Sequence, residues 1–104
     1  MEKGKVDFES LPWESPMAGV KSKTYKRDKR QLRLVEFTRE FVEPDWCTKG
    51  HCGYVLEGKL QIDFNGEIVV FIPGDGIFIP EGEGNKHSAK VLTQVVKVIL
   101  VEDG

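Results

Sequence analysis

Short stretches of alternating apolar and polar residues follow one another along the chain from residue 20 onward. Residues two apart in an extended strand point to the same side, so this alternation predicts β-strands with one buried face. Residues that favour turns separate the stretches. The segments expected to form strands are 20–25, 31–38, 53–56, 60–64, 68–72, 77–79, 87–93 and 95–101.

The turns between these segments indicate how the strands connect. Asn65-Gly66 lies between two apolar stretches, and both residues tolerate a positive φ, which is a strong hairpin signal. Residues 27–29 are expected to turn between the first two strands, and segments 87–93 and 95–101 are expected to form a last hairpin. No segment keeps a 3.6-residue period. The pattern therefore predicts an all-β sandwich or barrel with seven or eight antiparallel strands.

The first 19 residues do not follow this pattern. They contain Pro12, Pro16, Gly4 and Gly19 and only isolated large apolar side chains. We expect an extended N-terminal arm over residues 1–19 that packs a few side chains on a single domain formed by residues 20–104. A chain of 104 residues has room for only one hydrophobic core of ordinary size.

Composition narrows the protein class. Hydrophobic residues make up 39% of the chain and charged residues 31%, as in a soluble domain. The longest apolar run is about five residues, against roughly 20 for a membrane-spanning helix, so no membrane partner is expected. Two cysteines cannot build a disulfide scaffold, which favours a cytoplasmic location.

Charge is distributed unevenly along the chain. Residues 1–33 carry nine basic and five acidic residues, a net charge of +4, while residues 34–104 carry six and twelve, a net charge of −6. Seven of the thirteen residues in 21–33 are basic, which would suit an anionic partner. Tyr25 is the single aromatic residue among them, and the pI is near 5.7. We therefore interpret the segment as a solvated turn and expect no nucleic-acid partner.

Glycine and proline recur at fixed spacings in the second half of the chain, in Tyr54-Val55-Leu56-Glu57-Gly58 and at Gly74, Pro80 and Gly82. The first segment resembles the end of the first motif of the cupin superfamily, and the other three residues match the second motif at every spacing. The resemblance covers about residues 39–90. The resemblance implies a small jelly-roll barrel with a cavity at one end. It also implies homodimers, because small single-barrel cupins pair their sheets.

The metal-ligand positions of the family hold other residues here. His51 stands where the family carries glutamate, and Cys47 and Asp45 stand at the two histidines of the first motif. Asn85 occupies the histidine position of the second motif, and His87 follows two residues later. The opening glycine and the final asparagine of the motifs are replaced by Arg39 and Ala89. The resemblance therefore supports a fold more than an activity.

These departures still form a chemical pattern, because Asp45, Cys47, His51 and His87 can all bind metals. Even spacing allows Asp45, Cys47 and His51 to share one strand face, with Gly53 and Val55 inward and Cys52, Tyr54 and Leu56 outward. Thiolate and imidazole ligands suit zinc, while iron, nickel and copper remain open. The alternative is structural: a buried Cys47, a His51 bonded to a carbonyl group, and an exposed His87.

The sequence is compatible with three classes of function. The first is a metal-dependent enzyme. The second is a non-catalytic domain that binds or senses a carbohydrate or organic acid, with or without metal. The third is a metal-independent barrel similar to sugar epimerases. A small molecule is the expected partner in each, and the candidate substrate-binding residues are Asn85, Gln61 and Tyr54.

Overall fold

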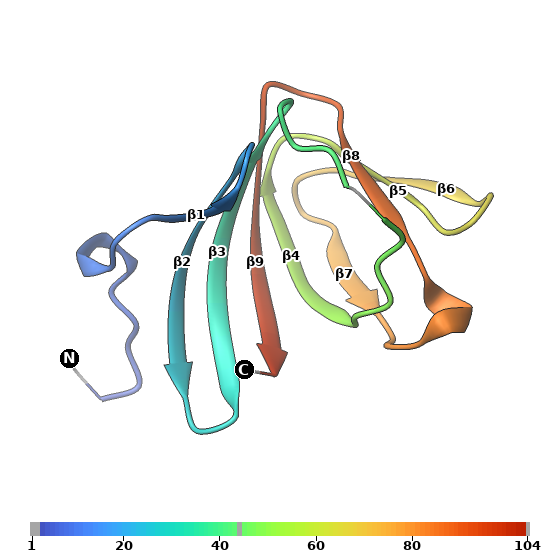
Figure 1. The fold of residues 1–104 in the computed structure, drawn as a ribbon. Helices are drawn as coiled ribbons and strands as arrows, with labels where there is room; N and C mark the ends of the chain where they lie inside the picture. The colour runs from blue at the N-terminus through green and yellow to red at the C-terminus, as the bar shows by residue number, and fades with distance from the viewer. Residues whose placement is uncertain (1–2, 44, 104) are drawn as a thin grey trace.

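The computed structural model describes residues 3–43 and 45–103, and these contain nine strands in two antiparallel sheets (Figure 1). The six-stranded sheet has the order β1 (Glu14–Met17), β2 (Val20–Arg27), β3 (Arg30–Thr38), β9 (Val95–Asp103), β4 (His51–Glu57) and β7 (Gly76–Ile79). The three-stranded sheet has the order β6 (Ile68–Phe71), β5 (Leu60–Asp63) and β8 (Ser88–Val91). Two short 3-10 helices span Phe8–Ser10 and Glu83–Asn85. Within the described residues, neither helix has the length and hydropathy needed to cross a membrane.

All eight predicted strands are present, and the ninth lies in the segment expected to be an arm. β1 pairs with β2 through Glu14 opposite Ser22 and Met17 opposite Val20. All four residues of β1 are exposed, so the strand carries no alternation that sequence could reveal. β1 is an edge strand, where Pro16 is tolerated because its missing N–H group is not needed by a further neighbour.

The predicted hairpin between Asn65 and Gly66 is confirmed, with φ values of 60° and 115° in the loop that joins β5 to β6. The prediction that segments 87–93 and 95–101 form a last hairpin is wrong. β8 pairs with β5, whereas β9 pairs with β3 and β4, so the chain crosses between the sheets after β8. Strand spacing alone does not say which sheet a strand joins. The chain also crosses between the sheets at Gly58, between β4 and β5. This position requires glycine, because its φ is 81° and a Cβ atom there would collide with the Val95 carbonyl oxygen.

The core lies between the two sheets. Its most deeply buried side chains are Val35, Val55, Val96 and Val98. Val98 lies opposite both Val35 and Val55 in the sheet register, and burying each such side chain contributes about 1.5–3 kcal/mol. Val55 points inward and Cys52, Tyr54 and Leu56 are exposed, which confirms the predicted alternation along β4.

The inner face of the large sheet changes from apolar to polar toward one end. On β9 the inward residues run Val96, Val98 and Leu100 and then reach Glu102. The facing residues on β3 change in the same direction, because Arg33 pairs with Leu100 and Gln31 pairs with Glu102. This end of the barrel therefore carries polar groups above an apolar core.

Candidate metal centre

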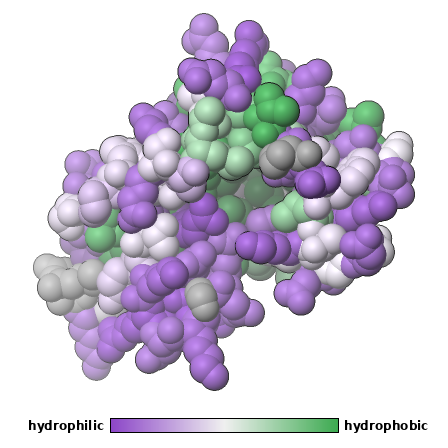
Figure 2. All heavy atoms as spheres, in the orientation of Figure 1, coloured by the Kyte–Doolittle hydropathy of each residue, from purple (hydrophilic) through white to green (hydrophobic). Residues whose placement is uncertain are grey.

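A cavity of about 870 Å³ opens at the polar end of the barrel. Both apolar and polar side chains line it, and Figure 2 shows a hollow with apolar atoms inside and hydrophilic residues along part of its rim. The apolar lining residues include Val35, Leu60, Ile62, Ile77, Val98 and Leu100. The polar lining residues include Gln31, Arg33, Glu43, Cys47, His51, His87 and Glu102.

Cys47 and His87 are brought together by backbone pairing between two loops. The Cys47 N–H donates to the His87 carbonyl oxygen at 2.8 Å, and the His87 N–H donates to the Cys47 carbonyl oxygen at 3.0 Å. This pair is an isolated antiparallel bridge, supported nearby by the Gly82 N–H, which donates to the Thr48 carbonyl oxygen at 2.9 Å. The loop before β4 is thereby fixed against the segment before β8.

His51 completes the group from the first position of β4. Its Nε2 atom lies 3.8 Å from the Cys47 Sγ atom, and its ring contacts the His87 ring edge-on with centroids 5.3 Å apart. One ligand atom from each of Cys47, His51 and His87 lies within 4.8 Å of the other two. His87 is only 2% exposed, so the alternative of a surface histidine is wrong.

Hydrogen bonds orient both imidazole rings. The His87 Nδ1 atom lies 3.0 Å from the Asn85 carbonyl oxygen, which can only accept, so we assign the proton to Nδ1. The His51 Nδ1 atom lies 3.1 Å from the Glu102 carboxylate and carries a proton for the same reason. In the neutral form, each ring therefore keeps a free lone pair on Nε2.

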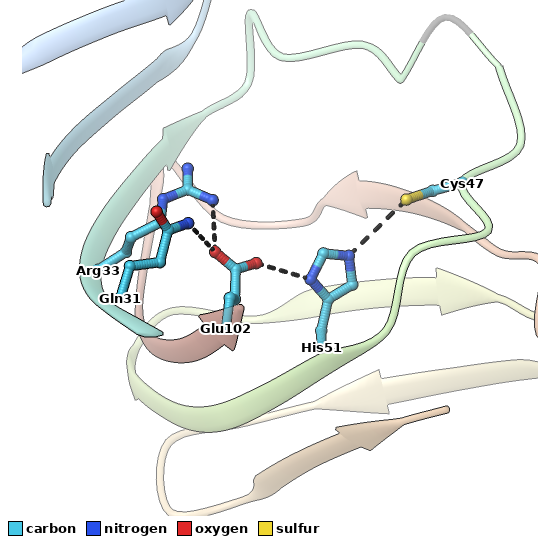
Figure 3. Close-up of polar contacts among 5 residues, drawn as sticks. All are labelled: Gln31, Arg33, Cys47, His51 and Glu102. Carbon is cyan, nitrogen blue, oxygen red and sulfur yellow. Dashed lines mark hydrogen bonds and ion pairs between the residues drawn. The ribbon is translucent and has the colours of Figure 1, made fainter. Parts of the chain in front are cut away.

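Glu102 is the centre of a polar network that continues from His51 to β3 (Figure 3). Its carboxylate accepts from His51, from Arg33 at 2.8 Å and from Gln31 at 3.0 Å. The hydrogen bond from His51, together with those from Arg33 and Gln31, outweighs burial and lowers the pKa of Glu102 from 4.5 to about 2. Glu102 is therefore ionised at neutral pH and fixes the orientation of the His51 ring.

The three side chains fit a transition metal. A tetrahedral zinc ion with Zn–S and Zn–N bonds of about 2.3 and 2.0 Å holds its ligand atoms about 3.5 Å apart. The separation of 3.8 Å between Cys47 Sγ and His51 Nε2 is close to that value. The bond from His51 to Glu102 is the carboxylate–histidine arrangement that commonly supports metal ligands. Three protein ligands leave one tetrahedral position for another group.

Two residues predicted beside the cluster have other positions. Asp45 is exposed and lines a separate shallow pocket with Gln61 and Asp63, so it does not join the group formed by Cys47 and the histidines. The chain around Asp45 is not a regular strand, and alternation therefore does not carry it to the same face as Cys47. Asn85 lies in the second 3-10 helix, where its backbone carbonyl group orients His87.

Gln61 and Tyr54 lie outside the cavity. Gln61 alternates on β5 with Leu60 and Ile62, whose side chains are buried in the core. Tyr54 is 46% exposed on the outer face of β4. The structure therefore brings together Cys47, His51 and His87 and does not bring these two predicted substrate-binding residues to them.

Sequence reasoning missed Glu102, Arg33 and Gln31. The signal was available for Glu102, since the inward positions of its strand continue in steps of two from Val96 to residue 102. A carboxylate at an inward position is uncommon without a partner. Its partners come from β3 and β4, which the sequence does not pair with this strand.

No protein-family model matches the chain, and no curated protein is significantly similar to it. Solved structures are similar. KdgF from Halomonas sp. is 23% identical over 89% of this chain and 87% of its own, with a TM-score of 0.73. The polyketide cyclase RemF from Streptomyces resistomycificus is 20% identical over 95% and 78%, with a TM-score of 0.78. An RmlC-like cupin from Shewanella frigidimarina is 18% identical over 97% and 90%, with a TM-score of 0.73.

These likenesses concern the fold. They extend over most of each compared chain, and they agree with the two facing antiparallel sheets. The glycine and proline spacing at Gly58, Gly74, Pro80 and Gly82 points to the same fold. The chain therefore has the jelly-roll fold of the cupin superfamily.

Proposed function

We propose that this cupin-fold protein binds a divalent transition metal through Cys47, His51 and His87 and uses it to bind a small molecule in the barrel cavity. The supporting observation is the convergence of three ligand atoms within 4.8 Å, with both histidine Nδ1 atoms already bonded to acceptors. A partly buried polar group of this kind is costly to maintain for packing alone, because apolar side chains would fill the space at no desolvation cost.

Zinc is the proposed metal, because one thiolate and two imidazole ligands match its preferences, and iron, nickel and copper are the alternatives. A bound metal would supply Lewis acidity toward an oxygen atom at its open position. The chain holds the ligands in place and provides an apolar cavity floor that excludes water from the small molecule. The proposal requires a reduced Cys47, which agrees with the cytoplasmic location expected from the sequence.

Metal content and thiol protection test this proposal together. We expect the purified protein to bind about one equivalent of zinc, measured by elemental analysis after removal of free metal. Zinc should slow alkylation of Cys47 by iodoacetamide at least ~10-fold, because a coordinated thiolate is a weaker nucleophile. Peptide mapping by mass spectrometry reports Cys47 and Cys52 separately in one sample.

Cys52 is the internal control, since it lies on the outer face of β4 and outside the ligand group, so zinc does not change its surroundings. Its alkylation rate should be the same with and without zinc. Equal protection of both cysteines would indicate a general effect of metal on the protein and would contradict the proposed site. A content below ~0.1 equivalent for zinc, iron, nickel and copper would instead favour a metal-free domain that binds small molecules.

We also propose that the outer face of the six-stranded sheet forms a homodimer interface. Phe78 is 80% exposed on β7, next to Cys52 on β4, which in turn pairs with the exposed Val101 on β9. Tyr54 and Leu56 extend this apolar surface along β4. Residues 3–19, the described part of the N-terminal arm, leave these side chains exposed, and Trp13 lies beside Lys21 and Lys23 of β2.

Phe78→Glu is expected to convert the dimer to a monomer, because it places a charge within the proposed apolar interface. Light scattering coupled to size-exclusion chromatography measures the mass directly. Val42→Glu is the matched control, since Val42 is 75% exposed in the loop after β3. A wild-type protein that is monomeric at micromolar concentration would refute this interface.

A further inference from the structure

A polar groove of about 630 Å³ adjoins the metal cavity on the inner side of β1, β2 and β3. Gln31, Arg33 and Pro16 line both the groove and the cavity, so the two spaces lie side by side. The remaining lining residues are Glu14, Ser15, Ser22, Thr24 and Lys26. An inward sheet face normally carries apolar residues, and this one carries hydroxyl groups and an ammonium group instead.

The sheet register connects the groove to the metal centre in a single row. Lys26 on β2 pairs with Gln31 on β3, and Gln31 pairs with Glu102 on β9. Glu102 in turn accepts a hydrogen bond from His51 on β4. The row of polar side chains thus starts at His51, a proposed metal ligand on β4. It continues across β9 and β3 and ends at Lys26 on β2.

Lys26 is the one cation in this row without a carboxylate partner among the described residues. Arg33, in the neighbouring row, is already paired with Glu102 at 2.8 Å. Glu14 lines the groove as well, but it pairs with Ser22, four residues from Lys26 along β2. At about 3.3 Å per residue, the two backbone positions are about 13 Å apart, and no ion pair joins the side chains.

We infer that the cavity and groove together bind an elongated, polyhydroxylated organic dianion. One oxyanion occupies the metal end beside His51, and the second is held by the Lys26 ammonium group. The Gln31 amide lies in the row between them, and the Thr24 hydroxyl lies next to Lys26 on the same face of β2, so both can bond hydroxyl groups of the ligand. This inference rests on the proposed metal function and adds a substrate class to it.

The size of the site sets the length of the ligand. His51 and Lys26 are separated by three strand intervals, or about 14 Å between backbones at 4.8 Å per interval. His51 lines the cavity and Lys26 lines the groove, so both side chains project toward the ligand and shorten the distance that it must span. An open six-carbon sugar acid with a second anionic group at its far end fits this separation.

Calorimetric titration of the zinc-loaded protein tests the inference with three probes. 6-Phosphogluconate and glucarate each carry two anionic ends, one ending in phosphate and the other in carboxylate, whereas gluconate carries a single anionic end. We expect at least one dianion to bind ~10-fold or more tightly than gluconate, since a charge-assisted hydrogen bond contributes about that factor. Comparing the two dianions identifies the preferred second group.

Lys26→Gln should weaken binding of the preferred dianion by ~10-fold and leave gluconate binding within twofold. Arg27→Gln is the matched control, because it removes the same charge from the next residue of β2, which alternation places on the opposite face. Both side chains are exposed, so neither substitution should affect folding. Equal weakening by the two variants would indicate general electrostatic attraction and would overturn the groove site.

Direct zinc measurement separates this inference from the proposed function. If zinc binds and neither dianion binds better than gluconate, the groove proposal fails and the metal proposal stands. If a dianion binds with the predicted dependence on Lys26 while the protein takes up no metal, the groove proposal is supported and the metal proposal fails.

Discussion

Cys47→Ser is expected to weaken zinc binding by at least ~100-fold. The change replaces the one soft ligand of the group with a hydroxyl that stays protonated at neutral pH and coordinates zinc poorly. Loss of a group that only supports a ligand commonly costs 10–100-fold in metal affinity, so loss of the ligand itself should cost at least the upper value. Competition with a chromophoric chelator measures the affinity of both proteins.

Cys52→Ser supplies the matched control for that experiment. Cys52 lies five residues from Cys47, on the outer face of β4, where its thiol is exposed and outside the ligand group. Its replacement should leave zinc affinity within twofold of the wild type. If Cys47→Ser also retained wild-type affinity, the thiolate would not be a ligand, and the proposed metal centre would be wrong in its composition.

Glu102→Gln is expected to lower zinc affinity by 10–100-fold, the range usual for loss of a carboxylate that supports a metal-bound histidine. The glutamine can still accept a hydrogen bond from His51, but it lacks the charge that makes the imidazole more basic. It also leaves Arg33 without its carboxylate partner. The same chelator competition gives the affinity, and thermal unfolding of the metal-free protein reports the structural cost separately.

A purely structural role for Glu102 would give a different result. Glu36→Gln is the matched control, because Glu36 lies on β3 and pairs with Lys21 across the exposed side of the sheet. The ring nitrogen NMR shifts of His51 add a second readout, since they report whether Nδ1 keeps its proton. A destabilised Glu102→Gln protein with unchanged zinc affinity would show that Glu102 supports the fold and does not position the ligand.

The alternation and turn residues were sufficient to predict eight of the nine described strands and two hairpins, the one that turns at residues 27–29 and the one at Asn65-Gly66. Val55 and Gly53 were predicted to point inward because residues two apart share a face, and that rule needs no tertiary information. β1 could not be predicted, since an exposed edge strand that contains Pro16 shows no alternation of buried and exposed residues. The sequence did not show that β8 pairs with β5 or that β9 pairs with β3 and β4. Hydrogen bonds between strands that are distant in the chain produce no local sequence pattern.

The candidate site, like the fold, was predicted only in part from the sequence. Sequence spacing selected Cys47, His51 and His87, since each has metal-binding chemistry and stands at or beside a family ligand position. It selected Asp45 as well, on the assumption that a regular strand continues through Cys47. The chain there forms a loop with one isolated bridge to His87, and a loop does not preserve the strand alternation.

By itself, the sequence determined an all-β domain, the inner and outer faces of its strands, and the two histidines and the cysteine most suited to a metal. These depend on local backbone geometry and side-chain chemistry. Tertiary structure decided that Glu102, Arg33 and Gln31 support His51 and that Gln61 and Tyr54 face away. Such contacts join residues up to 71 positions apart, and only the register between strands brings them together.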